Sequence, residues 1–174
     1  MSEAPIENKI PLTPLEDNIF SKVKAAFDEW FENRELSITK HIFHSISELG
    51  ELEGYDVYTS AYREGWMFDL AWLRKSETGL LQEVGLCLES ELADRSDGGL
   101  LTDFNKLIIA DSKIKVFICF EKPWKNDFPN SVNAIVKLLS NAISSYSGSN
   151  KQRIMVLIYS DYYSGELYPF VLSN

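Results

Sequence analysis

Apolar side chains recur along this chain with two different spacings, and the change from one to the other predicts the order of helices and strands. The first stretch has the three- and four-residue spacing of a helix and follows Thr13 and Pro14, which are typical of a capped helix start. The same spacing returns in a second stretch, where Gly50 is expected to end the helix. We therefore predict helices over about 14–33 and 37–49.

After Gly50 the pattern changes to short apolar runs separated by polar turns, which indicates strands. A turn is expected at Glu64–Gly65, a flexible loop over 94–99, and an edge position for the last strand because it contains Pro169. The predicted strands cover about 55–62, 66–73, 81–91, 115–120, 153–160 and 167–172, with further helices at about 102–112 and 131–146.

This order predicts an α/β protein with one mixed central β-sheet flanked by helices. Three meandering strands come first, and strand–helix–strand crossovers follow, which require a sheet with both antiparallel and parallel pairs. The strands at 115–120 and 153–160 are the richest in β-branched and aliphatic residues, so they should form its buried centre. A chain of 174 residues without an internal repeat or a long linker fits a single domain over 1–174.

Composition adds a cellular context. Hydrophobic residues make up 45% of the chain and aromatic residues 13%, which is typical of a globular protein. The longest apolar runs are far shorter than the roughly 20 residues of a membrane span, and the first residues do not resemble a secretory signal. Cys87 and Cys119 lie inside apolar runs, so we expect reduced core thiols and a cytoplasmic location.

The formal net charge of −9 counts against a protein whose main task is to hold nucleic acid, since affinity for the phosphate backbone comes largely from Lys and Arg. A local basic groove or bound metal ions can offset the total. The charge therefore weakens a nucleic-acid function without removing it.

Three carboxylates stand in strand-like runs, where charge is unfavourable. Asp69 lies within the apolar run "WMFDLAWL", and Glu89 and Glu91 end the run "VGLCLESE". If these two strands pair, Asp69 lies beside Glu89, and their repulsion is relieved by a divalent cation such as Mg²⁺ or Mn²⁺. Two alternatives stay open: Asp69 could bind a backbone group or Arg63, and the glutamates could lie at a solvated strand end.

A strand with Asp, a hydrophobic strand ending in Glu-x-Glu and a following helix resemble the PD-(D/E)xK nuclease superfamily, whose fold is called restriction-endonuclease-like. The resemblance implies an α-β-β-β-α-β core, here over about 37–120. The N-terminal helix at 14–33 and an α-β-β extension at 131–172 would be additions to that core.

The resemblance also implies roles for five residues. Asp69 takes the place of the motif's Asp, and Glu89 that of the following acid, so both would be metal ligands. Glu91 stands where most members have Lys, and would be a ligand or a general base. Lys106 is the candidate for a catalytic Lys that has moved to the following helix, and Glu48 for a further ligand on the preceding one.

Other interpretations of these residues remain. Lys106 falls nearly opposite the apolar stripe of its helix, as an ordinary exposed Lys does, and Lys115 is a rival for its role. His41, His44 and Glu48 share one helix flank that could bind zinc, although a solvated flank has the same pattern.

Two functions follow from the sequence. The first is a metal-dependent nuclease that hydrolyses the phosphodiester bonds of DNA, with weak, metal-dependent DNA binding. The second is a non-catalytic member of the same fold that acts through contacts with a protein partner. The carboxylates in strand contexts favour the first, and the displaced Lys and the net charge of −9 favour the second. An acidic mimic of nucleic acid is a third, less favoured idea.

Overall fold

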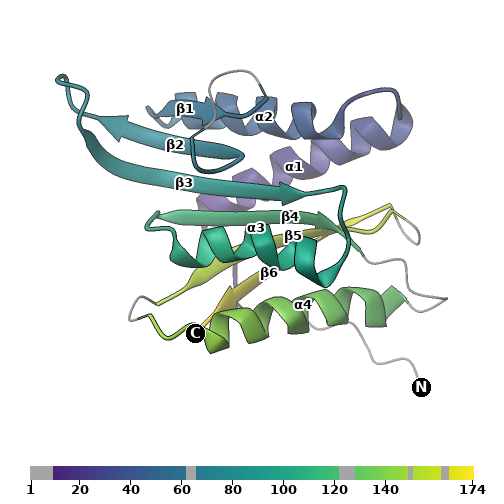
Figure 1. Cartoon of the computed structure of the whole chain (residues 1–174). Helices are drawn as coiled ribbons and strands as arrows, with labels where there is room; N and C mark the ends of the chain where they lie inside the picture. The colour runs from purple at the N-terminus through teal and green to yellow at the C-terminus, as the bar shows by residue number, and fades with distance from the viewer. Residues whose placement is uncertain (1–9, 62–65, 122–127, 149–150, 162–164) are drawn as a thin grey trace.

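The computed structural model describes residues 10–61, 66–121, 128–148, 151–161 and 165–174, and over these ranges the chain forms six strands and four helices (Figure 1). The strands are β1 (Asp56–Thr59), β2 (Leu70–Lys75), β3 (Leu81–Glu91), β4 (Ile114–Phe120), β5 (Arg153–Tyr159) and β6 (Leu167–Ser173). The helices are α1 (Pro14–Glu32), α2 (Ile38–Leu52), α3 (Asp97–Ile109) and α4 (Phe128–Ser145).

The strands form one mixed sheet in the order β1-β2-β3-β4-β5-β6. The first three are antiparallel neighbours, β3, β4 and β5 run parallel, and β6 returns antiparallel at the edge. The predicted α/β class, mixed sheet and opening meander are therefore confirmed. The parallel direction of β3, β4 and β5 brings their carboxyl ends to one edge of the sheet, where β2 and β6 begin (Figure 1).

Helices α1 and α2 cover one face of the sheet, and α3 and α4 cover the other (Figure 1). Side chains of β3 alternate between the two cores: Leu86 and Leu88 pack with α1 and α2, whereas Cys87 packs with α3 and α4. Continuing this alternation directs Glu89 toward α3 and Ser90 toward α2. Glu89 and Ser90, which are adjacent in the sequence, are thus assigned to opposite faces of β3.

The N-terminal helix begins as its capping box predicts. The Glu16 amide donates to Thr13 Oγ1 at 3.3 Å, and the Thr13 amide donates to Glu16 Oε2 at 2.7 Å. Arg153 at the start of β5 also binds Glu16, with 2.6 Å between Nη2 and Oε2. The cap therefore fixes α1 to the central sheet as well as starting the helix.

Several predicted boundaries are wrong, and two of them have local reasons in the loop before α3 and at the start of β2. The loop expected over 94–99 belongs in part to α3, because Ser96 caps the helix by accepting from the Gly99 amide at 3.1 Å. Strand β2 begins at Leu70, so Asp69 precedes the strand instead of lying within it. The turn expected at 64–65 lies outside the described residues.

The structure can be compared with two further predictions, which concern the cysteines and membrane-spanning segments. Cys87 and Cys119 are buried and unbridged, and burial raises the pKa of the Cys87 thiol to about 11. None of the described helices has the length and apolar character needed to cross a bilayer.

Helix α2 does not end at Gly50 but continues to Leu52, and Gly54 follows with a positive φ of 80°. Gly50 is instead a packing residue, since a Cβ placed there would lie 2.7 Å from Cδ1 of the fully buried Trp72. We expect Gly50→Ala to lower the free energy of unfolding by about 2 kcal/mol, because overpacking outweighs the gain in helix propensity. Urea denaturation measures this change.

Gly98→Ala is the matched control for this substitution. Gly98 also lies in a helix, but the nearest atom to its added Cβ is Ser96 Oγ at 3.9 Å. It should leave stability unchanged or raise it slightly. Equal effects of the two substitutions would contradict the packing role of Gly50.

Candidate metal site and adjoining cleft

The candidate site lies at the sheet edge where β3 ends, and Glu89 is its most buried member. This carboxylate is only 1% exposed, because it lies on a strand whose neighbouring residues belong to the core. Lys106 of α3 reaches it, with 3.3 Å between Nζ and Oε2, and is itself held by Asp103 at 2.7 Å. Within the described part of the chain, the other oxygen, Oε1, is buried without a hydrogen-bond partner.

The pKa of Glu89 is raised from its usual 4.5 to about 7, chiefly by burial and in addition by the nearby charge of Asp69, while Lys106 opposes the rise. The carboxyl group is therefore close to half protonated at neutral pH. A buried carboxyl with a raised pKa beside charged neighbours is a common feature of functional sites.

Asp69 is anchored to the neighbouring strand by Ser90. Its Oδ2 accepts from the Ser90 amide at 2.9 Å and from Ser90 Oγ at 3.1 Å, and its own carbonyl accepts from the Ser60 amide at 3.0 Å. Leu70 is paired with Leu88, which puts the residue before β2 next to the end of β3. Asp69 thus combines the position expected for a metal ligand with the backbone hydrogen bond that was the alternative. Arg63 lies outside the described residues.

Glu91 is occupied by local contacts. Its Oε1 accepts from the amides of Ala93 and Asp94 at 2.9 and 2.7 Å, which closes the turn after β3. This turn leads directly to Arg95 and the start of α3. In this arrangement Glu91 shapes the chain beside the site.

Glu48 and Lys115 are not brought to Asp69 and Glu89. Glu48 is on the exposed flank of α2, where its carboxylate lies 3.3 Å from His44 Nε2. Lys115 is buried at the opposite end of the parallel strands, and its Nζ donates to Gln152 at 2.7 Å. The structure gathers Asp69, Glu89 and Lys106, and leaves these two elsewhere.

The donor set decides whether a metal ion fits. The described residues contain no group of three or more Asp, Glu, His or Cys side chains arranged to hold an ion. Two neighbouring carboxylates, Asp69 and Glu89, are nevertheless a donor set that suits Mg²⁺, which is usually held by one or two carboxylates together with water and substrate phosphate. The unpartnered Oε1 of Glu89 gives such an ion a ligand atom, so the residues present fit this kind of site.

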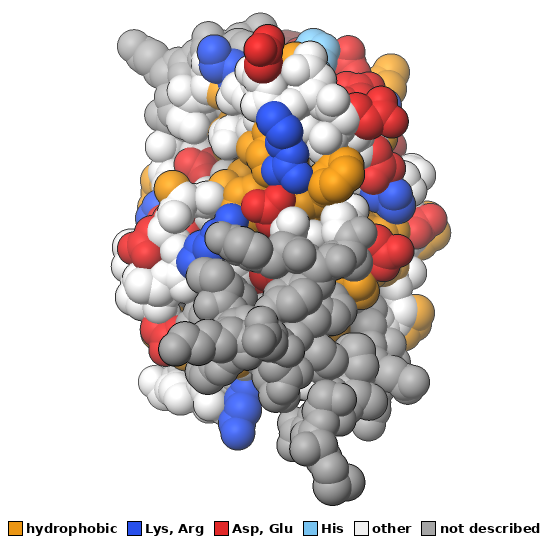
Figure 2. Space-filling view, turned by 90° about the vertical axis from the view of Figure 1, so that its right-hand side faces the viewer, with side chains coloured by type: hydrophobic (Ala, Val, Ile, Leu, Met, Phe, Trp, Pro, Cys, Tyr) orange, Lys and Arg blue, Asp and Glu red, His pale blue; other side chains and the backbone are white. Residues whose placement is uncertain are grey.

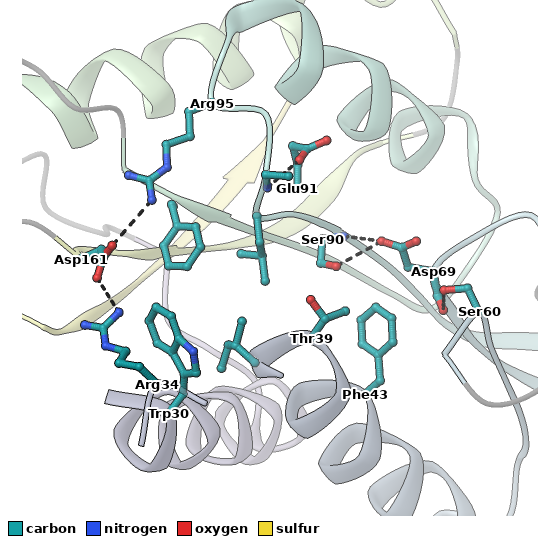
Figure 3. A pocket seen from close by; sticks show the side chains of 14 residues that line it. Trp30, Arg34, Thr39, Phe43, Ser60, Asp69, Ser90, Glu91, Arg95 and Asp161 are labelled. Carbon is teal, nitrogen blue, oxygen red and sulfur yellow. Dashed lines mark hydrogen bonds and ion pairs between the residues drawn. The ribbon is translucent and has the colours of Figure 1, made fainter. Parts of the chain in front are cut away.

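A cleft of about 530 Å³ lies on the α1–α2 side of the sheet and is lined by Asp69, whereas Glu89 is directed toward α3 on the other face and does not line it. One end is lined by Asp69 and Ser90, and the other by Arg34, Arg95 and Asp161 (Figure 3). Figure 2 looks onto this edge of the molecule, where basic and acidic side chains meet exposed hydrophobic ones. The cleft thus connects Asp69, one of the two candidate metal ligands, with a second charged cluster.

Sequence reasoning missed several of these residues. Asp103 had a local signal, since it stands three positions before Lys106 on a predicted helix, the spacing at which side chains meet. Arg34 and Asp161 are 127 positions apart and only the folded sheet brings them together. No pattern in the sequence indicates that contact.

The chain matches no protein-family model, and searches of the curated proteins and of the solved structures found no match at the threshold applied. The resemblance to the PD-(D/E)xK superfamily therefore depends on the residues and on the order of elements alone.

Proposed function

We propose that this chain is a divergent PD-(D/E)xK-like nuclease that hydrolyses phosphodiester bonds of DNA with Mg²⁺ or Mn²⁺. The observation that carries the proposal is Glu89: it is 1% exposed, has one oxygen without a hydrogen-bond partner among the described residues, and lies beside Asp69 and Lys106. Lys106 pairs with only one oxygen of this buried carboxylate, and a buried oxygen without a partner is costly. A cation-binding role supplies a reason for that cost.

The order of elements supports the same proposal. Helix α2, the meander β1-β2-β3, helix α3 and strand β4 follow one another as the α-β-β-β-α-β core of the superfamily does. On this interpretation α1 precedes the core, and α4, β5 and β6 extend it. The restriction-endonuclease-like topology is part of what we propose.

Each residue of the site has a distinct task in this proposal. Asp69 and Glu89 would hold the metal ion, which when bound lowers the pKa of a coordinated water and stabilises charge on the phosphate. Lys106, oriented by Asp103, would donate a hydrogen bond to the attacking water or to a phosphate oxygen. Glu91 would position the end of β3 through its turn contacts, and its predicted role as ligand or base would require it to release them.

Metal-dependent stability tests the proposal. Mn²⁺ should raise the free energy of unfolding, by about 2.7 kcal/mol at a hundredfold excess over Kd, because it binds the folded site. Asp69→Asn should abolish this gain and also abolish cleavage of labelled DNA. The measurements are thermal denaturation with and without metal and a gel assay of DNA cleavage.

Asp56→Asn is the control, since Asp56 is an exposed acid on β1 at the other end of the strand pair. It should keep both the metal response and the cleavage. A melting temperature that is indifferent to Mg²⁺ and Mn²⁺ at millimolar concentrations would contradict the proposed nuclease.

One observation favours the second candidate, a non-catalytic protein-binding module. Trp66, Met67 and Ile109 are 39%, 65% and 65% exposed, and they line a hollow of about 240 Å³ with Phe68 and Cys87. Exposed apolar clusters of this kind are typical of contact surfaces. A chain that ignores metal but retains its fold would leave this function as the better one.

A further inference from the structure

Two arginines share one carboxylate at the end of the cleft remote from Asp69. Arg34 Nη1 lies 2.9 Å from Asp161 Oδ1, and Arg95 Nη2 lies 3.7 Å from Asp161 Oδ2. Each oxygen of the carboxylate therefore faces a different guanidinium (Figure 3). The three groups come from the segment after α1, the turn after β3 and the segment after β5.

Aromatic rings hold both guanidinium groups in place. The Cζ atom of Arg34 is 3.8 Å from the ring centre of Trp30, and that of Arg95 is 4.6 Å from the ring centre of Phe120. Arg95 also donates from Nη1 to the carbonyl of Glu121 at 3.2 Å. Stacking of this kind restricts a guanidinium before any ligand arrives, which lowers the entropic cost of binding.

We propose that Arg34 and Arg95 form a phosphate-binding subsite for the nucleic-acid strand, and that Asp161 is the internal anion which this phosphate displaces. The proposal rests on the proposed nuclease function for its substrate class, although phosphate binding here needs no metal. Guanidinium forks match the oxygens of a phosphate as well as those of a carboxylate. The subsite would concentrate positive charge locally in a chain of net charge −9.

Displacement of Asp161 is feasible because the ion pairs remain accessible to water. The side chains of Arg34, Arg95 and Asp161 are 44%, 22% and 24% exposed. Ion pairs of partly exposed groups contribute little to stability and are screened by salt. A phosphodiester can therefore replace the carboxylate without disturbing the core.

The position of Arg34 and Arg95 at one end of the cleft indicates what the subsite would do. The cleft runs from the arginines to Asp69 and Ser90, and hydrophobic side chains including Trp30 and Phe120 form its walls. A strand whose phosphate binds the arginines would direct a neighbouring phosphate toward Asp69. The subsite would thus position the substrate strand and leave the chemistry to the other end.

Binding of a labelled single-stranded oligothymidine, followed by fluorescence anisotropy in EDTA at low salt, tests the proposal. Arg34→Gln and Arg95→Gln should each weaken the affinity about tenfold and reduce the salt dependence by about one counterion. Asp161→Asn should tighten binding severalfold, because it removes the competing anion and leaves both arginines.

Arg74→Gln is the matched control. Arg74 is also 44% exposed, stacks on Tyr55 at 4.5 Å and pairs with Glu83 at 3.5 Å, but it does not line the cleft. Its loss should leave the affinity unchanged. Competition by unlabelled oligothymidine and by inorganic phosphate distinguishes a strand from a free anion: the strand should displace the label at far lower concentration.

The proposed subsite would be rejected if the wild-type chain did not bind the oligothymidine or if the Arg34, Arg95 and Arg74 variants had equal affinities. Weaker binding by Asp161→Asn would also reject it, and so would equal competition by inorganic phosphate. A lower melting temperature of the arginine variants without a change in affinity would assign them a structural role instead. Metal-free binding that requires Arg34 and Arg95, without cleavage in Mn²⁺, would keep the subsite and reject the nuclease. Cleavage that ignores both arginines would do the reverse.

Discussion

Replacing Lys106 with methionine is expected to abolish DNA cleavage while leaving the stabilisation by Mn²⁺ in place above neutral pH. The ammonium group lies 3.3 Å from Glu89 and would act on the water or the phosphate, whereas the cation needs only the carboxylates. Removing one such donor from a preorganised site typically lowers the rate about a hundred- to a thousandfold. Methionine keeps most of the length of the side chain, so packing on α3 should be retained.

The pH of the measurement matters, because Lys106 lowers the pKa of Glu89. Without the ammonium group that pKa rises further above about 7, and the proton competes more strongly with the metal ion. The metal-induced rise in melting temperature should therefore be reduced near neutral pH and recover at higher pH. A comparison of melting curves with and without Mn²⁺ across this range measures the recovery.

Lys113→Met is the control for Lys106. Lys113 forms an ion pair with Glu83, at 2.7 Å between Nζ and Oε2, on a surface away from the candidate ligands. It should change neither cleavage nor the metal response. Cleavage that survives Lys106→Met would remove Lys106 from the mechanism and keep the enzyme.

The sheet could be predicted because the composition of its strands and the spacing of the turns between them are typical of β-structure. The buried runs of β4 and β5 and the polar turns of the meander follow directly from the requirement to fill a two-sided core. The predicted ends of helices and strands were wrong where a single contact determines the boundary. The sequence pattern predicts a helix end at Gly50, but this residue lies inside α2, where it packs closely against Trp72.

The candidate site was predictable as far as neighbouring strands allow. Pairing of Leu70 with Leu88 sets Asp69 beside the end of β3, as the hairpin argument expected. Lys106 shows the limit of a helical projection: its side chain is 43% exposed, as the projection indicates, yet it is long enough to reach Glu89. The angular position of a residue on a helical projection gives the direction of its Cβ atom, but it does not show how far the Nζ atom of a lysine can extend.

Neither the local turn contacts of Glu91 nor the contacts between remote segments could be predicted. The Glu91 carboxylate is drawn into a turn by two backbone amides, which no count of charges reveals. Arg95 and Asp161 meet because β3 and β5 end at the same edge, and Arg34 reaches Asp161 from the segment after α1. Sequence patterns report each element's own face, whereas this cleft is made where several elements end.

Glu89→Gln is expected to stabilise the metal-free protein above neutral pH and to abolish its response to Mn²⁺. The folded pKa of Glu89, about 7, exceeds the usual value of 4.5, so the native state binds the proton more tightly than the unfolded state. Stability from this group is complete below the lower value and is lost as the pH rises through the interval. Glutamine is neutral throughout and escapes that loss.

The pKa difference corresponds to about 3 kcal/mol at most. Relaxation around the buried charge and the loss of the Lys106 contact reduce it, so we expect a gain of about 1–2 kcal/mol near pH 8 and almost none near pH 4.5. Urea denaturation at both pH values, in EDTA, measures the difference between the variant and the wild-type chain.

Glu83→Gln should show the opposite dependence on pH. Lys113 and Tyr55 lower the pKa of Glu83, so its carboxylate stabilises the fold above the unfolded value and this contribution is lost in acid. The substitution should therefore destabilise the protein at the higher pH and have less effect at the lower one. If Glu89→Gln also destabilised the protein near pH 8, the Glu89–Lys106 pair would be a net stabilising ion pair, and the strained carboxylate that motivates the metal site would not exist.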